Sequence, residues 1–97
     1  MAERLTNLDT QNAVTEIAVT SGIDSIVSIK FEGDFDSGNF EVGYTDDNLS
    51  SGTFEAITGA TATADGDYVY TAGRDQRVFA RATGASPDIN VKTAVVS

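Results

Sequence analysis

The chain has 97 residues with no cysteine, no histidine and a formal charge of −9 at pH 7, which fits one small domain with a modest core. The missing residue types exclude Ser-His-Asp and Cys-His catalytic groups, disulfide bonds and the usual ligands of zinc and iron–sulfur sites. Because acids outnumber bases fifteen to six, we expect the protein to bind neither nucleic acid nor a membrane surface.

The N-terminal segment, residues 1–12, is polar, and Leu5 and Leu8 are its only large apolar residues after Met1. We expect an extended arm here, which either frays or orders on binding another subunit. The segment lacks the apolar run of a signal peptide, so the sequence predicts production in a cytoplasm without secretion. The domain itself is expected over residues 13–97.

The clearest strands alternate apolar and polar residues with a period of two. In residues 25–32, Val27, Ile29 and Phe31 share one face. Residues 39–45 repeat this pattern, and the link between them is bounded by glycines. These two strands are therefore predicted to form a hairpin.

Further strands are predicted at 53–57, 68–71, 76–83 and 89–96, and residues 13–20 fit either a first strand or a short helix. About seven strands separated by frequent turns predict an all-β fold, a single antiparallel β-sandwich or barrel. The side chains predicted to lie inside are Val27, Ile29, Phe31, Phe40, Val42 and Val91.

Acidic pairs are the remaining candidates for chemistry. Asp34 with Asp36, or Asp65 with Asp67, could act as acid and base on a glycoside, but a domain of this size leaves little room for a pocket. The stretch from Asp34 resembles the start of a calcium loop, yet its glycine and its twelfth residue, Thr45, depart from that pattern. Asp46-Asp47-Asn48 could supply further oxygen ligands for calcium only if the loops brought this segment next to Asp34 and Asp36. We interpret these acids as turn residues and predict no catalytic residue, no metal and no cofactor.

The tyrosines suggest an alternative function. Tyr44, Tyr68 and Tyr70 could form a platform that stacks on a sugar. A small carbohydrate- or ligand-binding module is therefore the second hypothesis, although the same residues also suit a core or an interface.

Charge is distributed unevenly along the chain. Residues 1–73 carry thirteen acids and two bases, a net −11, whereas residues 74–97 carry four bases and two acids, a net +2. The ordinary interpretation is a solvated surface with two sides. The more specific hypothesis is a subunit interface, formed by Arg74, Arg77, Phe79 and Arg81, that meets acidic turns of a neighbour. Such an interface should weaken as salt rises, and replacing Arg77 and Arg81 with Glu should lower association more than subunit stability.

The order of strand and turn signals from about residue 40 to residue 96 also carries a resemblance. It includes the segments Gly38–Tyr44, Gly52–Phe54, Ala64–Tyr68 and Arg77–Gly84. This order resembles that of the small β-sandwich virion structural proteins of tailed bacteriophages. The resemblance covers somewhat over half the chain and contains no signature motif.

The resemblance implies a non-enzymatic structural protein of the virion, most specifically a capsid decoration (cement) protein, or else a tail accessory. Its partners would be further copies of itself, with a trimer suited to capsid three-fold axes, and a major capsid or tail protein. The resemblance transfers no catalytic residue.

Overall fold

The computed structural model describes residues 3–20, 25–45, 54–73 and 76–96. These residues form eight strands: β1 (Glu3–Leu8), β2 (Thr15–Val19), β3 (Ser25–Asp34), β4 (Phe40–Thr45), β5 (Phe54–Ala62), β6 (Gly66–Ala72), β7 (Arg77–Ala82) and β8 (Asp88–Val96). None of the described residues belongs to a helix long and apolar enough to cross a membrane. The all-β fold predicted from the alternation is confirmed, with one more described strand than the seven expected.

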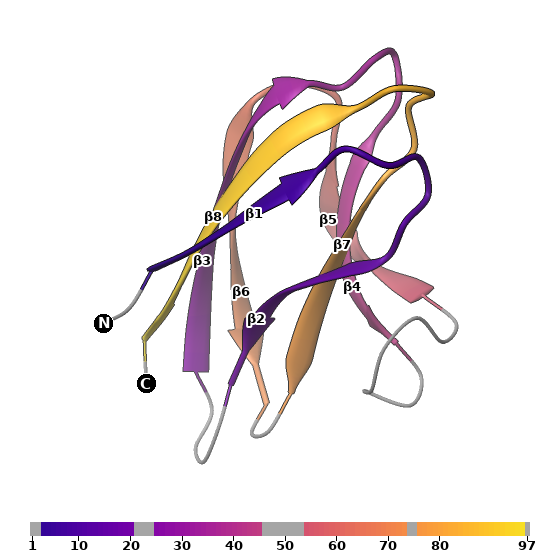
Figure 1. Ribbon diagram of the computed structural model, residues 1–97. Helices are drawn as coiled ribbons and strands as arrows, with labels where there is room; N and C mark the ends of the chain where they lie inside the picture. The colour runs from indigo at the N-terminus through magenta and orange to yellow at the C-terminus, as the bar shows by residue number, and fades with distance from the viewer. Residues whose placement is uncertain (1–2, 21–24, 46–53, 74–75, 97) are drawn as a thin grey trace.

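The strands form two four-stranded sheets that face each other (Figure 1). We call the sheet with order β1-β8-β3-β6 sheet A and the sheet with order β2-β7-β4-β5 sheet B. Every pairing is antiparallel, and the pairs β1·β8, β2·β7, β3·β6 and β4·β5 are those of one long hairpin folded over on itself. Two sheets of eight strands wound in this way form a jelly roll.

The predicted hairpin of the third and fourth strands is wrong, because β3 lies in sheet A and β4 in sheet B. Their link carries the chain from one sheet to the other. Phe35 in this link is 7% exposed and packs in the core, while Asp36 and Ser37 adopt positive φ angles of 48° and 63°. The Asp36 carboxylate also accepts a hydrogen bond of 2.6 Å from the backbone N–H of Ser86. These contacts hold a crossing that the glycine-bounded sequence alone did not distinguish from a tight turn.

The N-terminal segment, expected to be an arm, is an edge strand of sheet A. Strand β1 pairs with β8 in one unbroken register, from Glu3 opposite Ala94 to Leu8 opposite Ile89. Leu8 is buried and anchors the strand to the core. Six residue pairs with β8 and one buried leucine therefore order this segment, although its polar composition had suggested an arm outside the domain. Residues 15–19, left open between strand and helix, are strand β2.

The core between the sheets contains all six side chains predicted to lie inside. Four of them, Val27, Ile29, Phe40 and Val42, are fully buried, and Phe31 and Val91 are nearly so. The rings of Phe31 and Phe40 stack with centroids 4.3 Å apart. The register predicted from alternation is therefore confirmed for these strands.

One polar contact ties the two sheets across this core. The register of β2 shifts between Glu16 and Ala18, and the carbonyl of Ile17 accepts a hydrogen bond of 2.7 Å from the buried hydroxyl of Thr93 in β8. Burying a hydroxyl that keeps a hydrogen-bond partner costs little free energy, whereas burying an unpaired hydroxyl destabilises the fold. The bulge in β2 therefore fixes how the edge of sheet B lies against sheet A.

Candidate functional site

The outer face of sheet A carries an exposed apolar patch. Ile26 and Val96 lie opposite each other on β3 and β8 and are 48% and 44% exposed. Val69 on β6 is 62% exposed and lies opposite Ser28, which in turn lies opposite Ala94. We call Ile26, Val69, Ala94 and Val96 the sheet A patch. Aliphatic side chains grouped on a flat sheet face are typical of a protein–protein contact.

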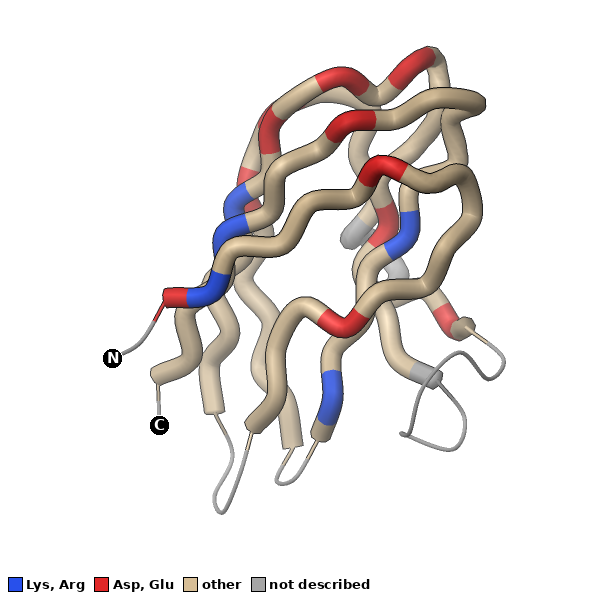
Figure 2. Tube along the Cα trace, in the orientation of Figure 1, with Lys and Arg blue, Asp and Glu red and all other residues tan. Residues whose placement is uncertain are grey.

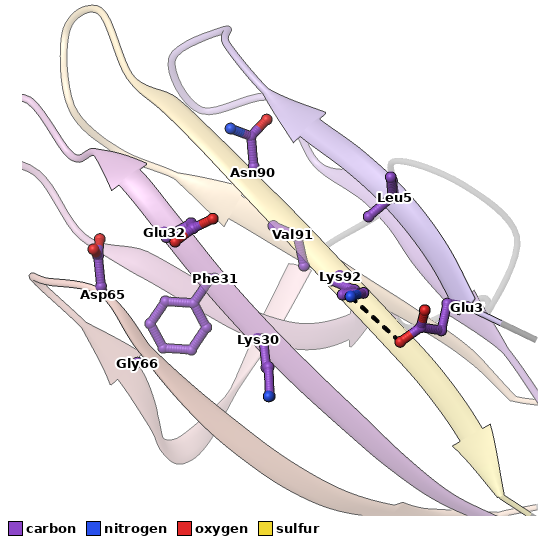
Figure 3. Close-up of a pocket in the computed structure, with 10 residues that line it drawn as sticks. All are labelled: Glu3, Leu5, Lys30, Phe31, Glu32, Asp65, Gly66, Asn90, Val91 and Lys92. Carbon is purple, nitrogen blue, oxygen red and sulfur yellow. Dashed lines mark ion pairs between the residues drawn. The ribbon is translucent and has the colours of Figure 1, made fainter.

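A charged cleft of about 700 Å³ adjoins the patch on the same face (Figure 3). Lys30 and Lys92 lie opposite each other on β3 and β8 at its centre, and Nζ of Lys92 lies 3.5 Å from a carboxylate oxygen of Glu3. The other residues that line it are Leu5, Phe31, Glu32, Asp65, Gly66, Asn90 and Val91. The expectation of little room for a pocket beside the core did not consider the outer face of the sheet, where this cleft takes no volume from the core.

The outer face of sheet B holds the predicted interface residues, except Arg74, which lies outside the described residues. Arg77, Phe79 and Arg81 share one face of β7, opposite buried Val78 and Ala80, as the alternation predicted. Phe79 is neither exposed nor part of the core cluster between the sheets. It is 2% exposed, and the guanidinium of Arg77 lies 5.5 Å from its ring centre. This aromatic side chain is therefore covered by its own chain on the outer side of the sheet.

Arg81 forms a second arginine–aromatic contact with residues of its own chain. Its guanidinium donates to Glu41, directly opposite on β4, at 2.7 and 3.0 Å and lies 4.7 Å from the ring centre of Phe54. A side chain at Gly43 would collide with the Glu55 carbonyl and with the Phe54 ring, so this close approach requires glycine. The basic segment is thus paired internally, and its contact with a neighbouring subunit stays a prediction.

Glu16 links the edges of the two sheets. It accepts hydrogen bonds of 2.7 Å from Arg4 on β1 and 2.6 Å from Arg77 on β7. Burial by itself would raise the pKa of Glu16, but the hydrogen bonds and positive charges of the two arginines outweigh it and hold the pKa below its ordinary value. A carboxylate with a lowered pKa in the folded state stabilises the fold while it is ionised.

We expect Glu16→Gln to lower the free energy of unfolding at pH 7 by about 1–2 kcal/mol, because it removes a charged acceptor from two arginines. The loss should shrink as pH falls through the lowered pKa of Glu16, where the wild-type carboxyl is also neutral. Urea unfolding at pH 7 and at acid pH measures both values. Exposed Glu32→Gln is the matched control, and an equal loss for Glu16→Gln at every pH would contradict this account.

The tyrosines lie on the inner side of the sandwich. Tyr68 and Tyr70 are half-buried and pack against the core cluster, which agrees with their interpretation as core residues. Tyr44 is half-buried beside Glu55, whose carboxylate accepts its hydroxyl hydrogen bond and thereby raises the pKa of the phenol. Their arrangement therefore provides no exposed aromatic platform on the β6 face.

The acids considered for catalysis or calcium gather at one end of the sandwich, where Figure 2 shows acidic positions and no basic ones. Several accept hydrogen bonds from backbone N–H groups: Asp34 from Asp36 at 2.9 Å, Asp36 from Ser86 at 2.6 Å and Asp65 from Gly33 at 3.0 Å. Such bonds are typical of turn residues. No group of three or more metal-binding side chains occurs in the part of the chain that the structure describes, and Asp46-Asp47-Asn48 lie outside it.

Comparison with known proteins identifies the fold and not a family. No protein-family model matches the chain, and no curated protein matches it. Among solved structures, the chain is similar to one described as "Bacillus endospore appendages form a novel family of disulfide-linked pili", with a TM-score of 0.52 and 15% identity. That similarity covers 99% of this chain and 85% of the other. At this identity the likeness concerns the fold alone.

Sequence reasoning missed the sheet A patch and the cleft. Ile26, Val69 and Val96 each stand among other apolar residues in the sequence, so only the strand register shows that they group on one outer face. The alternation in β3 did place Lys30 outward. Its neighbour Lys92, 62 positions later, could not be found without the β3·β8 pairing.

Proposed function

We propose that this protein is a non-enzymatic structural subunit that works by assembling with copies of itself and with a larger structural protein. The observation that carries the proposal is the sheet A patch, in which Ile26, Val69 and Val96 are 44–62% exposed on one flat face. Burying these aliphatic side chains against another protein is favourable by about 25 cal/mol per Å². The basic segment first considered for this contact is already paired with Glu16 and Glu41.

The fold is compatible with this class of function. A similar fold occurs in the solved structure that is described as a family of disulfide-linked pili. Those pili are described as disulfide-linked, whereas this chain has no cysteine and can form no disulfide bond. The likeness concerns the fold alone and gives no information about the contacts, so the assembly proposal rests on the sheet A patch.

The finer assignment is a capsid decoration protein of a tailed bacteriophage, and it rests on the order of strand and turn segments in the sequence. In this assignment the sheet A patch docks on a major capsid protein. Mass spectrometry of purified phage particles from the genome that encodes the chain should find it at a copy number comparable to that of the capsid protein. Its absence from such particles would overturn the virion assignment and leave the assembly proposal standing.

The patch itself is tested by a double substitution. Ile26→Ser with Val96→Ser removes two aliphatic side chains from the proposed contact, and we expect the association constant to fall at least about tenfold, which corresponds to about 1.4 kcal/mol. Val19→Ser is the matched control, because Val19 is 49% exposed on sheet B. Sedimentation velocity of the three proteins measures association. Equal association of the double variant and the wild type would overturn the role of the patch.

The second candidate is a ligand-binding module, and the cleft of about 700 Å³ is the observation that favours it. Its volume falls within the range of small-molecule sites, but its centre is lined by charged side chains instead of aromatic ones. A glycan array separates the two candidates. Binding to a defined sugar that is lost in Lys30→Ala would establish the module, whereas the structural subunit should bind none.

A further inference from the structure

The two edges of sheet A are both open to pairing. Among the described strands, β1 pairs with β8 alone in this sheet and β6 pairs with β3 alone. Both strands are regular, with no register shift against their partners. Proteins usually protect such edges with bulges or inward charges because an open edge invites a further strand. In sheet B, by contrast, both edge pairings, β2 with β7 and β4 with β5, contain register shifts.

The strand directions make the two open edges of sheet A complementary. Neighbouring strands are antiparallel throughout this four-stranded sheet, so β1 and β6 run in opposite directions. A second copy moved sideways by the width of one sheet therefore brings its β1 antiparallel to β6 of the first copy, and a shift along the strands then sets the register of the pair. This contact is heterologous and leaves a free β1 and a free β6 at the ends, so it can repeat.

One register matches the side chains along this junction. In an antiparallel pair, directly opposite residues share a face. Leu5 on β1 is 78% exposed and Val69 on β6 is 62% exposed, both on the outer face, and placing them opposite each other buries the two most exposed aliphatic side chains of the described chain.

The same register aligns the rest of both strands without opposing like charges. Arg4 comes opposite Tyr70 and Thr6 opposite Tyr68 on the inner side, while Asn7 comes opposite Asp67 and Glu3 opposite Thr71 on the outer side. A slip of two residues in either direction places Leu5 against a polar partner, Asp67 or Thr71. Cross-strand pairs of matching chemistry contribute about 0.2–1 kcal/mol each, so the register is specified by side chains as well as by backbone hydrogen bonds.

We infer that copies of this chain join edge to edge through β1 and β6 into a linear polymer with a continuous sheet A. This inference rests on the proposed structural function and specifies its partner as a second copy. Each added subunit widens the sheet by four strands, about 19 Å at the usual strand spacing. The exposed Ile26 and Val96 then recur along one side of the polymer, where the sheet A patch can contact further copies of the chain or a larger structural protein.

The absence of native cysteine gives a direct test, in which Leu5→Cys and Val69→Cys are combined in one full-length chain. Opposite residues of paired strands have Cα atoms about 4.5–5.5 Å apart, within disulfide reach. Within one chain the two positions lie at least three strand spacings apart, about 14 Å, and are also offset by two residues along the strands, so no internal disulfide can form. Mild oxidation should therefore give a ladder of disulfide-linked oligomers on a non-reducing gel. The matched control, Leu5→Cys with Thr61→Cys, places the second thiol on an exposed residue of β5 in sheet B and should give no ladder.

Single-cysteine variants complete the test. After oxidation, a mixture of the Leu5→Cys and Val69→Cys chains should give disulfide-linked mixed dimers on the non-reducing gel, whereas each variant alone should run as a monomer there. Efficient dimers from either variant alone would mean two-fold pairing of like edges and would overturn the inference, as would the lack of a ladder. If the ladder is absent while Ile26→Ser with Val96→Ser still loses association, the edge inference fails and the proposed function stands.

Discussion

Phe40→Ala is expected to lower the free energy of unfolding by about 3–5 kcal/mol, which is a large share of the stability of a domain this small. Phe40 is fully buried at the start of β4, and its ring stacks on Phe31 with centroids 4.3 Å apart. Truncation removes an aromatic ring from both the core of sheet B and its contact with sheet A. Urea or thermal unfolding of the purified variant measures the loss.

The neighbouring strand offers a matched control for this substitution. Phe54 on β5 lies on the outer face of sheet B beneath Arg81, so Phe54→Ala should cost only about 1 kcal/mol, the value of an arginine–aromatic contact. Should Phe40→Ala fail to fold, Phe40→Leu leaves a smaller cavity and should cost less than Phe40→Ala, although it also loses the stacking on Phe31. Equal losses for Phe40→Ala and Phe54→Ala would contradict the assignment of Phe40 to the core.

The second large effect is expected from Arg77→Glu combined with Arg81→Glu. The sequence alone predicted that this change would act on association more than on subunit stability. In the structure both arginines form hydrogen-bonded ion pairs with Glu16 and Glu41, which lie on neighbouring strands of the same chain. We therefore expect the double variant to lower the free energy of unfolding by about 3–6 kcal/mol, since each charged hydrogen-bonded pair is worth about 1.5–3 kcal/mol.

A charge exchange separates this mechanism from a general loss of arginine. Glu41→Arg combined with Arg81→Glu restores an opposite-charge pair at directly opposite positions of β4 and β7. It should recover part of the stability lost in Arg81→Glu alone, although not the contact between Arg81 and Phe54. A double variant in which unfolding is unchanged while association is lost would favour the interface first predicted from the sequence.

The face of the sheet on which each side chain lies was predictable, because period-two alternation depends only on neighbours in the sequence. Val27, Ile29 and Phe31 point inward for this reason, and the same rule separated Arg77 and Arg81 from Val78 and Ala80. Strand partners were not predictable. The jelly roll pairs β1 with β8 across the full length of the domain, and the pattern of one strand carries no information about so distant a partner.

The candidate site depends on those distant partners, which is why the sequence did not reveal it. Ile26 meets Val96 only through the β3·β8 register, and the open edges exist only because β1 and β6 end the same sheet. Phe79 shows a different limit. Its alternation predicted an outward side chain, but that side chain is 2% exposed and the guanidinium of Arg77 lies over its ring, which no local pattern predicts.

Sedimentation velocity of the wild-type protein over a range of protein and salt concentrations tests the central claim, self-assembly through sheet A, most directly. Each subunit carries a formal −9, and added salt shortens the reach of that repulsion from about 8 Å at physiological ionic strength to about 3 Å at 1 M. Association through apolar side chains and strand edges should therefore rise with protein concentration and rise further with salt. A single species of 10.2 kDa at every concentration and salt would contradict the claim. Association that weakens with salt would instead indicate the basic segment as the contact.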